Sequence, residues 1–125
     1  MKFISRRVHA ILDYIVGILL IFAPALLGFS HIAAAKYSAI VVGILVLAVT
    51  LLTKHEGGVA KIIPLPTHLV MDVIFGILLA LSPWILNFSD EVFLPHLLVG
   101  LFSIIAGVCT APASQHGVNP KGVLS

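Results

Sequence analysis

The sequence predicts an all-α membrane protein of four transmembrane helices, arranged as two tandem helical hairpins. Three features lead to this prediction: an apolar composition, four apolar runs, and an internal repeat of polar residues. Of the 125 residues, 60% are hydrophobic and only 10% are charged, and the mean hydropathy is +1.18. A soluble domain is about 45–50% apolar and about 25% charged. Lipid is therefore the expected solvent for most of this surface.

Four apolar runs supply the expected spans, and they cover residues 8–29, 37–53, 65–88 and 92–110. A helix needs about 20 apolar residues to cross the roughly 30 Å hydrocarbon layer. The first and third runs meet this length easily, and the other two are near its lower limit. A cleaved signal peptide is the rival interpretation of the first run, because basic residues precede it. The run is long for a signal, and its pattern recurs in the third run, so we favour a span.

The chain matches itself when it is shifted by 59 positions. The matched residues are His9 with His68, Asp13 with Asp72, Gly17 with Gly76, and Pro24 with Pro83. A two-residue adjustment in the hairpin loop also pairs Gly43 with Gly100 and Thr53 with Thr110. Two spans per copy place both copies in the membrane in the same sense. The copies are thus expected to be related by a pseudo-two-fold axis along the membrane normal.

The repeat divides the chain into four parts. Residues 1–53 form the first two-helix repeat, 54–64 a cytoplasmic linker, 65–110 the second repeat, and 111–125 a flexible cytoplasmic tail. Six of the seven basic residues lie before the first run, in the linker or in the tail, and only Lys36 lies in a hairpin loop. The positive-inside rule therefore predicts that both termini are cytoplasmic.

A short motif distinguishes the second copy from the first. Ser82-Pro83-Trp84 stands late in the third run, where the first copy has Ala23-Pro24-Ala25. With this motif after the His-x-x-x-Asp-x-x-x-Gly pattern, nearly the whole chain resembles the SPW-repeat family of small prokaryotic integral membrane proteins. The repeat of that family is a pair of transmembrane helices with Ser-Pro-Trp in the first. The resemblance implies a multi-pass protein of the prokaryotic inner membrane and no particular activity. The first copy lacks the serine and the tryptophan, so a role of Trp84 need not be duplicated.

The duplicated His and Asp residues are the candidate functional residues. His9 and Asp13 lie four residues apart, as do His68 and Asp72, so each pair occupies one helix face near the cytoplasmic end. A carboxylate at the bilayer centre costs about 2.5–3.5 kcal/mol, and less nearer the interface. Such residues usually face the bundle interior. We favour a structural role in which these groups hold the hairpins together. A proton- or ion-responsive relay and a zinc or iron site made of all four residues are the alternatives.

The other repeated residues favour structural interpretations. Pro24 and Pro83 are expected to kink their helices, and Ser82 can bond the carbonyl that Pro83 frees. Trp84 is expected to anchor the chain at the outer interface. Small residues permit close approach of membrane helices. This applies to the four glycines Gly17, Gly43, Gly76 and Gly100.

These features favour a structural, interaction or accessory membrane subunit, which self-associates or binds another membrane protein. The alternative is a small proton- or ion-linked transporter, channel or sensor that uses the His/Asp pairs, and a metal or redox protein is weaker. No nucleophile–base set, phosphate loop or Cys/His cluster stands in the sequence. We therefore expect no enzyme and no cofactor. A net charge of +2 with scattered basic groups predicts no nucleic-acid binding, and the single Cys109 is expected to be a packing residue.

Overall fold

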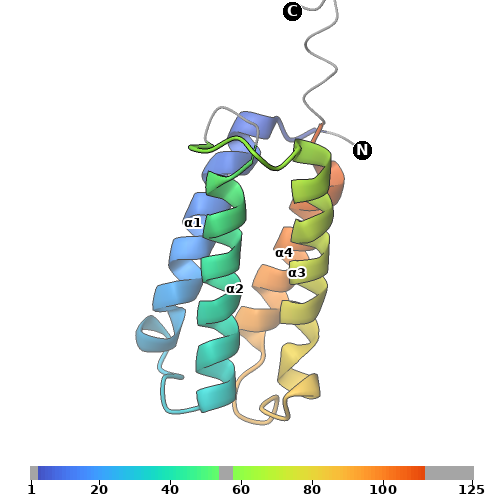
Figure 1. Ribbon diagram of the computed structural model, residues 1–125. Coiled ribbons are helices and arrows are strands. Elements are labelled where there is room, and N and C mark those ends of the chain that lie inside the picture. The colour runs from blue at the N-terminus through green and yellow to red at the C-terminus, as the bar shows by residue number, and fades with distance from the viewer. Residues whose placement is uncertain (1–2, 54–57, 112–125) are drawn as a thin grey trace, which may run out of the picture.

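The fold is a bundle of four helices, given by a computed structural model that describes residues 3–53 and 58–111 (Figure 1). The helices are α1 (Arg6–Leu26), α2 (Ala33–Leu51), α3 (Leu65–Ile85) and α4 (Leu94–Cys109). Short loops join α1 to α2 and α3 to α4 at one end, called here the hairpin end. Helices α1 and α3 begin at the opposite end, the linker end. The described residues form isolated β-bridges but no strand.

The helices fit a membrane by length and composition. Helices α1, α2 and α3 are each long and apolar enough to cross a bilayer. Helix α4 is also apolar but has 16 residues, which give it a length of about 24 Å. A shorter span is accommodated by local thinning of the bilayer or by flanking residues that reach the interface. The predicted all-α membrane fold with four helices is therefore confirmed.

The helix boundaries differ from the predicted apolar runs at the start of α2 and at the ends of α1 and α3. Helix α2 begins at Ala33, four residues before the predicted start, because Lys36 interrupts the apolar run but not the helix. Three alanines precede this lysine and favour helix. Helices α1 and α3 end three residues before the predicted 29 and 88. Parts of the predicted linker (54–57) and tail (112–125) lie outside the described residues.

The early ends of α1 and α3 have the same backbone geometry. Gly28 and Asn87 adopt the left-handed conformation, with φ of 79° and 60°. The N–H group of the next residue, Phe29 or Phe88, donates to the carbonyl of Pro24 or Pro83 at 2.9 or 2.8 Å. This is a Schellman motif, which satisfies a terminal carbonyl and ends the helix. Both phenylalanines are then buried, so each motif also closes the core at the hairpin end.

The helices of each hairpin pack closely through pairs of glycines. A Cβ atom on Gly43 would lie 2.8 Å from the carbonyl oxygen of Gly17. The second repeat is tighter, because a Cβ atom on Gly100 would lie 2.5 Å from the carbonyl oxygen of Gly76. Backbone-to-backbone approach of this kind requires residues without side chains.

The two hairpins meet through equivalent contacts at the linker end. Ile4, before α1, pairs with Thr110 after α4, and Ile63, before α3, pairs with Thr53 after α2. In the repeat, Ile4 is equivalent to Ile63 and Thr53 to Thr110. The predicted two-fold axis therefore maps each of these contacts onto the other.

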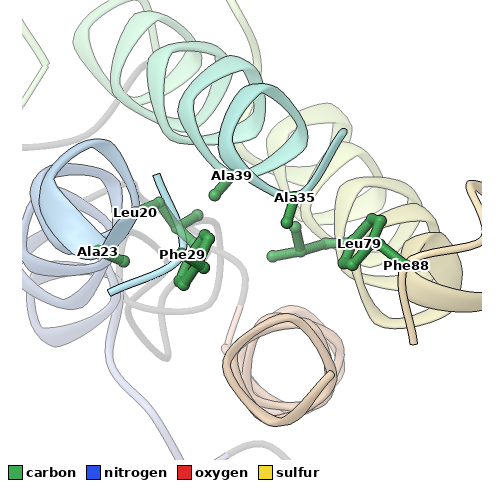
Figure 2. Packing of buried hydrophobic residues seen from close by; sticks show 7 residues of the cluster. All are labelled: Leu20, Ala23, Phe29, Ala35, Ala39, Leu79 and Phe88. Atoms are coloured by element: carbon green, nitrogen blue, oxygen red, sulfur yellow. The ribbon is translucent and has the colours of Figure 1, made fainter. Parts of the chain in front are cut away.

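At the hairpin end the core is apolar (Figure 2). It consists of Leu20, Ala23, Phe29, Ala35, Ala39, Leu79 and Phe88. Two grooves flank this cluster on the outside of the bundle. A groove of about 660 Å³ lies between α2 and α3 and includes Val42 and Ser82. The equivalent groove of about 240 Å³ between α1 and α4 includes Ala23 and Val99.

Candidate functional site: a ring of two histidines and two aspartates

The four candidate residues of α1 and α3 meet inside the bundle near the linker end. They are the fourth and eighth residues of these helices, which lie on a diagonal of the bundle. His9 and His68 have no exposed surface, and Asp72 and Asp13 are 1% and 7% exposed. The two imidazole rings are 5.4 Å apart, edge to face. We refer to His9, Asp13, His68 and Asp72 as the His/Asp ring.

Nitrogen and oxygen atoms alternate around this ring. The Nε2 atom of His9 lies 2.6 Å from Oδ2 of Asp72, and Nε2 of His68 lies 2.7 Å from Oδ2 of Asp13. The two contacts within each helix are 3.0 Å. The shortest contacts therefore join the two repeats, and the ring ties α1 to α3.

Two threonines fix the orientation of the imidazoles. Nδ1 of His9 lies 2.7 Å from Oγ1 of Thr110, and Nδ1 of His68 lies 2.5 Å from Oγ1 of Thr53. Each threonine hydroxyl also donates to the carbonyl four residues earlier, at 2.5 Å. A hydroxyl has one hydrogen. The threonine oxygen must therefore accept from the imidazole, and both histidines carry a proton on Nδ1.

This tautomer sets the charge of the ring. An imidazole with its single proton on Nδ1 presents a lone pair at Nε2. Here each Nε2 faces carboxylate oxygens at 2.6–3.0 Å, and two bare acceptors at that distance repel each other. The ring must hold two positive charges to balance two carboxylates. Two additional protons or one divalent cation supply them.

The repeat is broken on one side of the ring. Thr50 of α2 makes a weak contact of 3.4 Å from its hydroxyl to Asp13. The equivalent residue of α4 is Gly107, which has no hydroxyl. Among the described residues, Oδ1 of Asp72 has no hydrogen-bond partner. A buried carboxylate oxygen without a donor is uncommon and calls for an explanation.

The Ser-Pro-Trp motif lies at the hairpin end, away from the ring. The hydroxyl of Ser82 donates to the carbonyl of Leu79 at 2.7 Å. This is the carbonyl that would accept from residue 83 if that residue were not proline. Trp84 is about half exposed and packs against Phe93, with ring centroids 5.8 Å apart. The serine thus satisfies the backbone group that the proline leaves open.

A third buried histidine, His96, lies at the hairpin end and does not join the ring. The Nε2 atom of His96 contacts the carbonyl of Ala35 at 3.0 Å and Oγ of Ser38 at 3.1 Å. Its ring packs against Phe29 and Phe88. This arrangement was not predicted from the repeat, because His96 has no histidine equivalent in the first copy.

Thr53 and Thr110 were not among the residues predicted to form the site. The signal was present, because these threonines match each other in the repeat and end two apolar runs. Their contacts to His9 and His68 cross 101 and 15 positions of the chain. Only the folded bundle brings them together.

A family model described as the SPW repeat domain matches residues 7–110, which include all four helices except the first residue of α1. No curated protein and no solved structure matches the chain.

Proposed function

The chain belongs to the SPW repeat family, and from that premise we propose that it is a non-enzymatic structural or accessory subunit of the prokaryotic inner membrane. In this proposal the His/Asp ring locks two hairpins into one rigid bundle. The bundle then offers a stable apolar surface to a second copy or to another membrane protein. The mass of the detergent-solubilised complex, measured by light scattering, distinguishes an assembly from a monomer.

The observation that carries this proposal is the reciprocal bonding of the ring. Each imidazole bridges both aspartates, and its shorter contact is to the aspartate of the other repeat. Its Nδ1 partner, Thr110 or Thr53, also comes from the other repeat. Burying a charged group is costly unless it is paired. The pairing therefore couples correct docking of the hairpins to satisfaction of the ring, which is the behaviour expected of a structural lock.

The apolar core at the hairpin end also favours a lock over a channel. A polar path across the membrane would have to continue from the ring toward that end. The cluster there contains leucine, alanine and phenylalanine side chains, which provide no hydrogen-bonding groups (Figure 2). The polar side chains of His96 and Ser38 at that end bond to each other and to the carbonyl of Ala35 rather than to the ring. Channels and proton relays use polar or charged groups along the path.

Proton flux through reconstituted vesicles tests the lock against a proton-linked role. We expect the wild-type protein to conduct no faster than empty vesicles when a membrane potential is imposed and a pH dye is enclosed. The matched variant is Asp13→Asn/Asp72→Asn, which removes charge and keeps hydrogen-bonding groups. Flux above the background that this variant abolishes would replace the structural proposal with the proton-linked one.

The proposal places the linker end in the cytoplasm. Arg6, Arg7 and Lys61 lie at that end, whereas Asp90 and Glu91 lie at the hairpin end. The positive-inside rule supports this orientation. We expect a membrane-impermeant maleimide to label Ser30→Cys in intact cells, and Ala60→Cys only after permeabilisation, both in a Cys109→Ser background. Ser30 and Ala60 are exposed, so the reverse labelling pattern would show the opposite orientation.

A further inference from the structure

We propose that the His/Asp ring is a binding site for one divalent transition-metal ion. Its ligands are Nε2 of His9 and His68 and one carboxylate oxygen each of Asp13 and Asp72. The inference goes beyond the proposed structural function, because a lock made only of protonated side chains needs no metal. The structural proposal survives if the metal site is wrong.

The donor set has the composition and spacing of a metal site. One possible ligand atom from each of the four residues lies within 4.8 Å of the other three. Imidazole nitrogen and carboxylate oxygen together suit zinc, iron or manganese. Two carboxylates and two neutral imidazoles carry a charge of −2, so a divalent ion makes the buried centre neutral.

The distances require only a small expansion. Zinc–ligand bonds of about 2.0–2.2 Å in a tetrahedron place neighbouring ligand atoms about 3.4 Å apart. The four nitrogen–oxygen contacts of the ring are 2.6, 2.7, 3.0 and 3.0 Å. Each must therefore widen by roughly 0.4–0.8 Å to reach that tetrahedral spacing. We expect rotation of the side chains to supply this change.

The surrounding groups prepare the ring for a cation. Thr53 and Thr110 hold the proton of each histidine on Nδ1, so both Nε2 lone pairs point to the centre. Histidine ligands of metals typically donate their other N–H group to an oxygen in this way. Asp72 has an oxygen without a hydrogen-bond partner among the described residues. That oxygen is free to turn toward an ion.

The site is closed, which defines its role. All four ligands come from the protein and all are buried. A four-coordinate ion in a closed site is structural, because no position is left for substrate or water. Binding would displace the two additional protons of the ring and cross-link α1 to α3.

Elemental analysis of the protein, purified with an affinity tag that contains no histidine, is the first test. We expect about one zinc, iron or manganese ion per chain. The Asp13→Asn/Asp72→Asn variant should bind less than a tenth of this amount and remain folded by circular dichroism. His31→Gln, which removes an exposed loop histidine, should retain the ion. Equal metal content in the wild type and the double-Asn variant would overturn the site.

Titration of the chelator-treated protein with zinc, manganese and ferrous iron is the second test. We expect the best of these ions to raise the thermal midpoint by about 10 °C at a hundredfold excess over Kd. Thr53→Val keeps all four ligands but removes the acceptor for Nδ1 of His68, and should weaken affinity about 10–100-fold. Thr50→Val removes the weak contact to Asp13 and a hydroxyl bond to the carbonyl of Val46. It leaves both imidazole–threonine bonds intact and should change affinity little. Absence of stoichiometric metal together with an unchanged midpoint would contradict the proposal.

Discussion

Asp13→Leu is expected to lower the free energy of unfolding by about 3–5 kcal/mol, because breaking a buried ion pair leaves its partners uncompensated. The substitution removes the acceptor that lies 2.7 Å from His68 and 3.0 Å from His9. Both imidazoles then depend on Asp72 alone. Unfolding in mixed micelles, followed by circular dichroism in the presence of a chelator, measures the loss without a contribution from metal.

The control for this prediction is a double variant, which carries more substitutions but should lower the free energy of unfolding less. In Asp13→Asn/Asp72→Asn, each amide donates to one Nε2 lone pair while Nδ1 remains bonded to its threonine. The ring then has matched donors and acceptors without buried charge, and we expect a loss of about 1 kcal/mol. A double variant as unstable as Asp13→Leu would show that the ring requires charge rather than hydrogen bonds.

The sequence was sufficient to predict the fold and the residues of the candidate site. It did not predict which of these residues contact one another. Apolar runs and the repeat of His9, Asp13 and Gly17 in the second half were sufficient to predict four helices in two hairpins. They also placed each His/Asp pair on one helix face. Periodicity reports only on contacts within one helix, and here the shortest contacts join α1 to α3.

The sequence patterns did not predict the helix ends or the two threonines that bond the ring histidines. An apolar run continues through Gly28 and Phe29, whereas the helix ends at Leu26 because the backbone turns left-handed. Thr53 and Thr110 are site residues because each one bonds the histidine of the other hairpin: Thr110 bonds His9, and Thr53 bonds His68. Local propensity does not specify such long-range docking.

The second large effect is expected at the tightest helix contact, within the second hairpin. Gly100→Ala should lower the free energy of unfolding by about 1–3 kcal/mol, the usual cost of overpacking. The new Cβ would lie 2.5 Å from the carbonyl oxygen of Gly76 and 2.6 Å from the backbone nitrogen of Ala80. Backbone atoms of a helix do not move aside singly, so α3 and α4 must separate.

Gly17→Ala in the first hairpin is the matched control. Its new Cβ would lie 2.6 Å from the side chain of Leu47, but its nearest backbone contact, the carbonyl oxygen of Gly43, would be farther away, at 3.1 Å. A leucine side chain can change rotamer, so the cost should be smaller. Both variants gain about 1 kcal/mol of helix propensity from alanine, and the difference between them therefore reports packing alone. Equal unfolding free energies for the two variants would mean that the α3–α4 contact relaxes as easily as the α1–α2 contact.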